Sequence, residues 1–192
     1  CFGCGEGGDV ITFLQRQQNL SFTEAVQTLA DRAGITLRIT DDGQGPGQPP
    51  GQRKQILEAN AAAQEFFAAQ LASPEAVTAR QFLDQRGFDR AVAEQFVLGY
   101  APRGGHALRQ ALISQGFDEA TLRAAGLVRD GGRDFFSGRL LWPIRDSASS
   151  VLGFGGRRIF DDDRLPAKYI NTPETPVYKK SHVLYGLDLA RR

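Results

Sequence analysis

The chain has 192 residues, of which 41% are hydrophobic and 23% are charged, a composition typical of a folded globular protein. No apolar run approaches the ~20 residues that a membrane-spanning helix needs, so we predict no membrane partner. Basic and acidic side chains nearly balance, 23 against 22, but residues 137–192 carry ten basic and six acidic ones. A polyanionic ligand is therefore expected to bind this last third.

The first elements that the sequence predicts are two short helices within residues 1–38. Asp9 can cap a helix that begins at Val10. Ser21-Phe22-Thr23-Glu24 is a capping box, in which the hydroxyl and the carboxylate each bond the amide of the other residue. Gly34 is expected to end the second helix in the left-handed conformation. This segment also begins at Cys1 in a chain that has no Met, and we expect the natural protein to start upstream.

A linker is predicted over residues 39–53. Its central part reads DDGQGPGQPPG, in which seven of eleven residues are Gly or Pro. Such a segment has little to bury and cannot propagate a helix or a strand. We therefore expect it to tether two domains.

Helices are predicted next, from Lys54 to about Phe96. The first carries an apolar stripe that includes Ile56, Ala63 and Phe67. Ser73 followed by Pro74 predicts the start of a second helix, which Gly87 ends. Asp89 is expected to cap a third. Further helices are predicted at about 106–115 and 118–125, after a short strand at 98–101.

The last predicted elements are strands, over Leu140–Ile144, Ser150–Phe154 and Lys168–Asn171. The first two are expected to form a hairpin around a polar turn at 146–149. The predicted fold class is therefore α+β: a helical hairpin, a linker, then helices followed by a mixed or antiparallel sheet.

The two cysteines, Cys1 and Cys4, admit three interpretations. Their spacing suits two ligands of a tetrahedral zinc site, but such a site needs four, so this chain would supply half. A thiol redox pair and two surface cysteines are the alternatives. Cysteines this few and this close together indicate a reducing compartment.

Several ordered sequence blocks resemble bacterial DnaG-type primases. The first part of the resemblance is Cys-Phe-Gly-Cys-Gly over residues 1–5, followed by Leu-Ser-Phe-Thr-Glu-Ala-Val over 20–26, and it is similar to the end of the family's zinc-binding domain. The second part is similar to the N-terminal subdomain of its RNA polymerase domain. It consists of Arg-Leu-Leu-Trp-Pro-Ile-Arg-Asp over 139–146, Gly-Phe-Gly-Gly-Arg over 153–157, Lys-Tyr-Ile-Asn-Thr-Pro-Glu-Thr over 168–175 and Leu-Tyr-Gly-Leu over 184–187.

The resemblance implies the domain organisation and the function. It implies a zinc-binding remnant at 1–38 and a template-binding subdomain at 54–192. The parent protein is expected to make short RNA primers on single-stranded DNA, from ribonucleoside triphosphates, as a bacterial cytoplasmic and nucleoid-associated nucleotidyltransferase. The resemblance implies structural zinc, magnesium or manganese in a TOPRIM subdomain beyond this chain, and a replicative helicase as partner. This chain is expected to bind template and to be catalytically inactive alone. A stand-alone nucleic-acid-binding module and a thiol redox protein are the alternative functions.

The family analogy also implies a set of contacts to the DNA template or the incoming nucleotide. They are Arg86, Arg139, Arg157, Lys168, Tyr169, Asn171 and Lys180. An ammonium can offset a phosphate, an aromatic ring can stack on a base, and an amide can bond a base edge. On a regular strand Tyr169 and Asn171 would face one side and Lys168 the other. Removing the charge of Lys168 or Arg157 is expected to weaken binding and to flatten its salt dependence.

Further motifs bear on how closely DNA could approach this interface and on how positive its charge is. The glycines at 153, 155 and 156 are typical of a closely packed strand, and the resemblance adds that bare backbone lets a DNA strand pass close to the sheet. Asp-Phe-Phe-Ser at 134–137 stands where relatives tend to have Asp-Arg-Phe-Arg, so two cations of the family are missing. Three aspartates at 161–163 place negative charge beside the interface. We do not expect them to form a magnesium site, because two-metal sites draw their acids from separate elements.

Overall fold

The computed structural model describes residues 7–35, 37, 51–163 and 165–190. The chain divides into two compact units, Cys1–Pro50 and Gly51–Arg192. Cys1, Cys4 and most of the predicted linker lie outside the described residues. Among the described residues, no helix is both long enough and apolar enough to span a bilayer.

The first unit contains a pair of helices, α1 (Val10–Gln18) and α2 (Phe22–Ala33). Both predicted N-caps are present. Asp9 Oδ1 accepts a hydrogen bond from the amide of Thr12 at 2.8 Å. The Ser21 amide donates to Glu24 Oε2 at 2.8 Å, and the Glu24 amide donates to Ser21 Oγ at 3.3 Å, which completes the capping box. Gly34 follows α2 at φ 67°, in the left-handed conformation that ends the helix.

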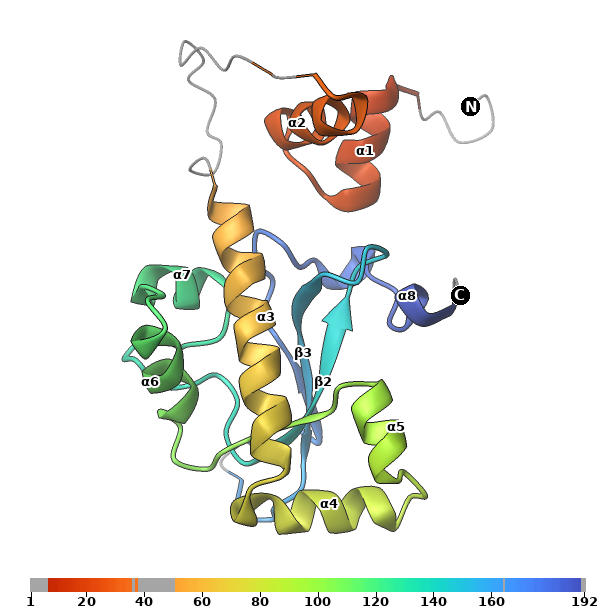
Figure 1. Cartoon of the computed structure of the whole chain (residues 1–192). Coiled ribbons are helices and arrows are strands. Elements are labelled where there is room, and N and C mark those ends of the chain that lie inside the picture. The colour runs from red at the N-terminus through yellow and green to blue at the C-terminus, as the bar shows by residue number, and fades with distance from the viewer. Residues whose placement is uncertain (1–6, 36, 38–50, 164, 191–192) are drawn as a thin grey trace. The chain divides into compact units, whose positions relative to one another are not determined.

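The second unit is built from helices before and after a sheet (Figure 1). The helices are α3 (Gln52–Leu71), α4 (Val77–Asp84), α5 (Arg90–Gln95), α6 (Ala107–Ser114), α7 (Glu119–Ala124) and α8 (Leu187–Ala190), with short 3-10 turns at Pro74–Ala76 and Lys180–His182. Asp89 caps α5 as predicted, accepting from the Val92 amide at 2.8 Å. Ser73 precedes Pro74 but its side chain makes no capping bond within the described part of the chain. No sequence pattern predicted α8 or the turn at Lys180–His182.

In the described residues the sheet has four antiparallel strands, in the order β1 (Gly99–Ala101), β2 (Arg139–Arg145), β3 (Val151–Arg158) and β4 (Tyr169–Asn171). All four strands were predicted, although β3 runs four residues beyond its predicted end at Phe154. The α+β fold class is confirmed.

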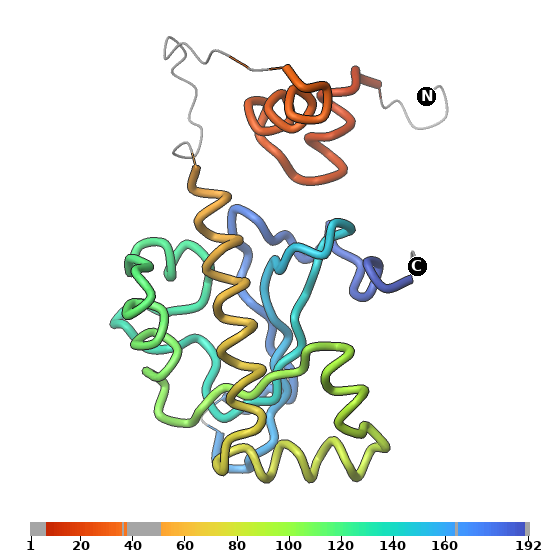
Figure 2. The backbone as a smooth tube through the Cα atoms, viewed as in Figure 1, coloured from red at the N-terminus to blue at the C-terminus, as the bar shows by residue number. Residues whose placement is uncertain are grey.

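One face of the sheet packs against α3, which contacts β1 and β3 (Figures 1 and 2). Phe67 of α3 meets Phe154 of β3 edge to face, with 5.3 Å between ring centroids. A side chain at Gly99 would come within 2.6 Å of Phe67 Cβ, so glycine allows β1 to approach α3 closely. Helices α6 and α7 contribute the rest of this core through Leu108, Leu112 and Leu122.

The opposite face of the sheet is covered only in part. A second apolar cluster joins Leu83 of α4 and Ala93 of α5 to Tyr100 of β1 and Leu140 of β2. These helices therefore shield the β1 side of this face and leave the β3–β4 side uncovered by them.

Candidate nucleic-acid interface

The register of the sheet decides which residues reach its open face. Cross-strand partners in an antiparallel sheet point to the same side. Leu140, Arg157 and Tyr169 form one such row. Trp142, Gly155 and Asn171 form a second row on the same side. The row between them, which includes Gly156, faces the α3 core. The predicted alternation along β4 is therefore present, with Tyr169 and Asn171 on the open face.

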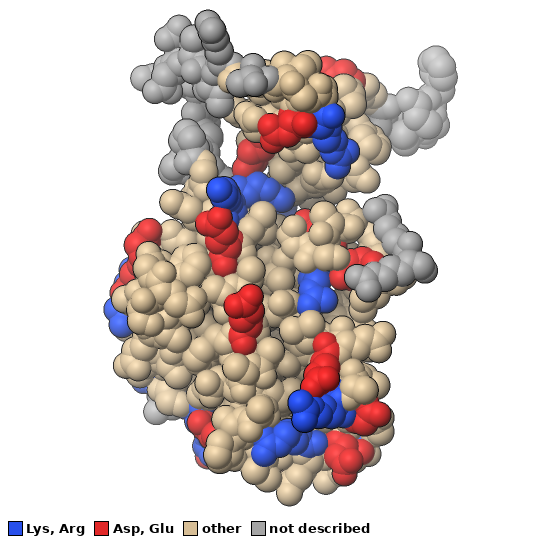
Figure 3. Space-filling view, in the orientation of Figure 1, with Lys and Arg blue, Asp and Glu red and all other residues tan. Residues whose placement is uncertain are grey.

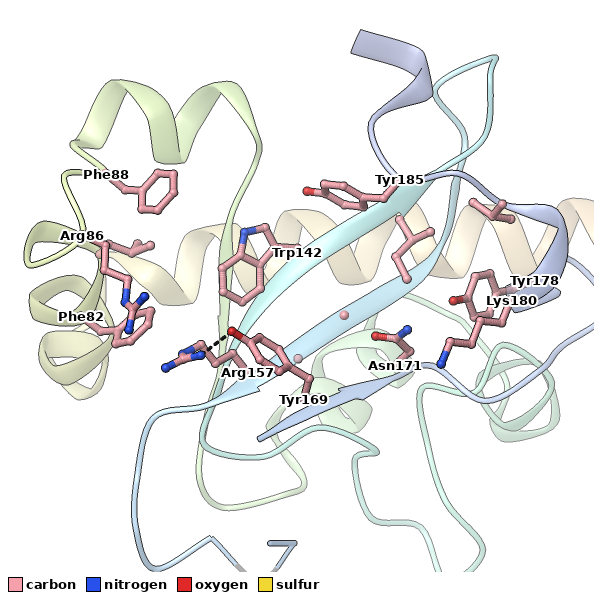
Figure 4. A pocket seen from close by; sticks show the side chains of 15 residues that line it. Phe82, Arg86, Phe88, Trp142, Arg157, Tyr169, Asn171, Tyr178, Lys180 and Tyr185 are labelled. Carbon is pink, nitrogen blue, oxygen red and sulfur yellow. Dashed lines mark hydrogen bonds between the residues drawn. The ribbon is translucent and has the colours of Figure 1, made fainter. Parts of the chain in front are cut away.

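A groove of about 520 Å³ lies on this open face. We call it the sheet groove. Its wall on one side comes from α4 and the residues after it, its floor from β2, β3 and β4, and its other wall from the segment between Tyr178 and Tyr185 (Figure 4). Its lining consists of Phe82, Leu83, Arg86, Phe88, Trp142, Ile144, Gly155, Gly156, Arg157, Tyr169, Asn171, Tyr178, Lys180, Val183 and Tyr185.

Five of the seven predicted contact residues line this groove: Arg86, Arg157, Tyr169, Asn171 and Lys180. They come from a stretch of almost one hundred residues and meet only because α4 and the C-terminal segment fold onto the same side of the sheet. Arg86, Asn171 and Lys180 are exposed, so their polar groups can reach a ligand from solvent. Lys168 is exposed too but lies outside the lining, with its Nζ 6.0 Å from the centre of the Tyr169 ring.

Cations and aromatic rings alternate along one side of the groove. The guanidinium of Arg86 lies 4.7 Å from the centre of the Phe82 ring, and that of Arg157 lies 4.3 Å from the same ring. Arg157 also lies 5.2 Å from the centre of the Tyr169 ring. Each contact is within the range of cation–π attraction. The series Arg86, Phe82, Arg157, Tyr169 and Lys168 therefore links three predicted cations through two rings.

Arg157 is the most enclosed of these cations. Only 8% of its surface is exposed. Its Nη1 donates a hydrogen bond to the hydroxyl of Tyr169, as Figure 4 shows. Tyr169 itself is 60% exposed. The arrangement thus places a shielded guanidinium behind an accessible ring.

Arg139 lies apart from the groove, in the interior. It is 1% exposed, and its Nη2 lies 2.8 Å from Asp163 Oδ2. It donates to the carbonyls of Leu165 and Ala167, each at 3.0 Å. Burial lowers the pKa of Arg139, and the nearby Asp163 carboxylate opposes that shift. These contacts show that Arg139 anchors the loop between β3 and β4.

The three aspartates at 161–163 do not converge on one point. Asp163 pairs with Arg139, and Asp162 pairs with Arg103. No group of three or more potential metal ligands occurs among the described residues. Asp162 and Asp163 thus neutralise arginines beside the sheet, and none of the three aspartates lines the sheet groove.

The glycines of β3 pack closely, as their pattern predicted. A side chain at Gly153 would come within 2.8 Å of Thr172, and one at Gly156 within 2.8 Å of the Phe136 ring. A side chain at Gly155 would point into the groove and meet Asn171 Oδ1 at 3.3 Å. Two of these glycines serve packing, and the third keeps the floor of the groove low.

The aromatic residues of the groove are what the sequence analysis missed. Phe82, Phe88, Trp142, Tyr178 and Tyr185 line it together with Tyr169. Burial raises the pKa of Tyr178, and a hydrogen bond from the Asn171 side chain lowers it. Trp142 carried a signal, because it is the lone Trp and faces away from α3 by strand alternation. No sequence pattern marked Phe82 or Phe88 as groove residues, since their place there depends on how α4 packs against the sheet.

Two family models match the chain. The model described as "DNA primase catalytic core, N-terminal domain" matches residues 66–191, and the model described as "CHC2 zinc finger" matches residues 1–45. The fold and the first of these matches place residues 66–191 in the class of N-terminal domains of DNA primase catalytic cores. The chain belongs to the DnaG primase family.

Individual relatives agree with this assignment. The chain is 54% identical to the DNA primase of Mycolicibacterium smegmatis, a match that covers 100% of this chain and 31% of that protein. It is similar to the RNA polymerase domain of Mycobacterium tuberculosis primase DnaG in complex with a double-stranded DNA oligomer with a 6-nucleotide overhang, at a TM-score of 0.72 and 54% identity, over 74% of this chain and 45% of that one. A DnaG primase catalytic domain bound to single-stranded DNA matches at a TM-score of 0.65 and 34% identity, over 74% of this chain and 45% of that one. The chain thus spans about a third of the length of the curated relatives it matches.

Proposed function

We propose that this chain is the part of a bacterial primase that holds single-stranded template DNA in the sheet groove. The observation that carries the proposal is the convergence of Arg86, Asn171 and Lys180 with six aromatic side chains on the one open face of the sheet. Cations that follow the backbone, combined with rings on which bases stack, are the usual means of binding single strands.

The charges around the groove suit a polyanion. Arg86, Lys168 and Lys180 are exposed, and they are the cations best placed to neutralise phosphates. On the face of the second unit that carries α3, by contrast, basic and acidic side chains are interspersed (Figure 3). A strand of DNA is therefore attracted to the groove side more than to the α3 side.

The whole protein would synthesise short RNA primers by joining ribonucleoside triphosphates on this template. Phosphoryl transfer of this kind needs divalent cations held by carboxylates, and the groove lining contains no Asp or Glu among the described residues. As the family resemblance implies, we propose that the magnesium or manganese site lies in a TOPRIM subdomain outside this chain, and we expect this chain alone to make no primer. We also propose that one of the groove cations, such as Arg86, contacts the phosphates of an incoming ribonucleoside triphosphate.

Structural zinc is proposed for the parent protein. The zinc-finger match over residues 1–45 favours zinc ligands over a redox pair for Cys1 and Cys4. Two thiolates are half of a tetrahedral site, and the remaining ligands would come from residues upstream of Cys1.

The parent protein is further proposed to work at the nucleoid in the cytoplasm and to contact the replicative helicase through a part that this chain lacks.

Substitution of Lys180 tests the template-binding proposal. Lys180→Gln is expected to weaken binding to single-stranded DNA whatever its base sequence, because a phosphate contact carries no sequence information. The slope of log affinity against log salt concentration should fall by about 0.7, the value for one phosphate contact on a single strand. Fluorescence anisotropy of a labelled oligonucleotide over a series of salt concentrations measures both quantities.

Lys54→Gln is the matched control, since Lys54 is a lysine on α3 whose side chain is 82% exposed. It removes the same charge away from the groove and should leave affinity and slope nearly unchanged. Equal effects of the two substitutions would show that DNA is attracted by net charge alone and would contradict a template site in the groove.

A further inference from the structure

The environment of Arg157 does not suit a phosphate contact. Its guanidinium lies between the rings of Phe82 and Tyr169, 4.3 Å and 5.2 Å from their centres, and 8% of the residue is exposed. Its Nε is buried and has no hydrogen-bond partner among the described residues. Its Nη1 is used by the Tyr169 hydroxyl. A phosphate could reach this group only after one of the rings had moved.

Tyr169, in contrast to Arg157, is exposed to solvent. It stands on β4, a strand of three residues that pairs, within the described part of the chain, with β3 alone, and 60% of its surface is exposed. An aromatic side chain so exposed would sample several rotamers if nothing held it. Arg157 restrains it twice, through the hydrogen bond to the hydroxyl and through contact with the ring.

Phe82 provides the support behind Arg157. It is half-buried on α4, and it contacts Arg157 on the groove side as well as Arg86. A planar guanidinium stacks on an aromatic ring and still directs its N–H groups sideways, which an ammonium cannot do. Arg157 therefore couples the position of the ring on β4 to the wall formed by α4.

We infer that Arg157 is a positioning residue, which holds the ring of Tyr169 against Phe82 so that the exposed side of that ring stacks on a base of the single strand. This inference rests on the proposed function and deepens it. The groove then recognises nucleobases at Tyr169 and phosphates at the exposed cations such as Lys180. Arg157 acts through Tyr169 and contributes its shape rather than its charge, so removing its charge should leave the salt dependence unchanged, which replaces the expectation from the sequence.

Two oligonucleotides of equal length separate these roles: an oligo-dT strand and an abasic strand with the same number of phosphates. The wild-type chain is expected to bind oligo-dT more tightly. Tyr169→Ala should weaken oligo-dT binding about tenfold, within the range for losing one stacked base, and leave abasic binding unchanged. Arg157→Lys keeps the charge but loses the planar fork, and it should weaken oligo-dT binding severalfold with abasic binding and the salt slope unchanged.

Tyr169→Phe provides a second variant that is expected to fold, since it removes only the hydroxyl that accepts the hydrogen bond from Arg157. It keeps the ring, loses the acceptor for Arg157, and should lie between the wild type and Tyr169→Ala in oligo-dT affinity. Lys180→Gln should weaken both strands equally. The inference is overturned, with template binding intact, if Arg157→Lys binds both strands as the wild type does. It is also overturned if Arg157→Ala weakens abasic binding and lowers the salt slope as Lys180→Gln does. A wild-type chain that binds neither strand would instead end the proposed function, and the inference with it.

Discussion

Two adjacent glycines of β3 face opposite sides of the sheet, and substitution should affect them differently. An added methyl at Gly156 would meet the buried Phe136 ring at 2.8 Å and Leu141 at 3.1 Å. Because a packed core cannot yield freely, Gly156→Ala is expected to destabilise the second unit by about 1–3 kcal/mol. Urea unfolding of Gly156→Ala and of the wild type measures this loss of stability.

Gly155→Ala serves as the control for that experiment. Its methyl would meet only the end of the exposed Asn171 side chain, at 3.3 Å, and this side chain can move. The expected change in unfolding free energy is within about 0.5 kcal/mol. Equal destabilisation by both substitutions would contradict the assignment of the two faces.

The role of an individual residue was harder to predict than the type of residue that the site needs. Arg139 and Arg157 both belong to strands and both come from family blocks, yet one bonds carbonyls in the interior and the other supports a ring in the groove. The difference follows from the sheet register and from the course of the β3–β4 loop, which no local pattern encodes. Tyr169, Asn171 and Lys180 were predictable as groove residues because the family resemblance identified them.

At the level of the elements, capping chemistry was the most reliable guide. Asp9, Ser21 and Asp89 all cap as predicted, because a cap is decided by residues three positions apart. The predicted end of β3 was wrong, since Gly155 and Gly156 have little strand preference of their own. Pairing with β2 on one side and β4 on the other carries the strand through them.

The contact between α6 and α7 should make stability depend on pH. Glu119 lies 2.5 Å from Arg109 and 2.6 Å from Arg123, and hydrogen bonds from these two arginines, Arg109 first, lower the pKa of Glu119 below the ordinary 4.5. A carboxyl whose pKa is lower in the folded than in the unfolded chain stabilises the fold above its ordinary pKa. This stabilisation is lost as the pH falls through the lowered value.

Glu119→Gln is therefore expected to lower the urea midpoint near neutral pH and to reduce the further decline of the midpoint as the pH is lowered toward about 3. Glu58→Gln, at an exposed i,i+4 pair on α3, is the control and should follow the wild type closely. If the acid-side decline of Glu119→Gln parallels that of the wild type, Glu119 does not contribute to it.

At the scale of the whole molecule, the proposed template site depends on the uneven covering of one sheet. Helices α3, α6 and α7 bury one face with a continuous apolar core, whereas α4 and α5 cover only the β1 side of the other. The α+β class followed from the order of helical and strand periods in the sequence. The location of the groove did not, because it is set by the tertiary packing of α4 and of the segment after β4.

Photocrosslinking tests the central claim most directly, since it reports where a bound strand lies. A single-stranded oligonucleotide carrying 5-iodouracil would be crosslinked to the chain, and the modified residues identified by mass spectrometry. Binding in the sheet groove predicts crosslinks at Tyr169, Trp142 and Tyr185, all of which line it. Crosslinks confined to the α3, α6 and α7 side of the second unit, with none at these three residues, would contradict the account.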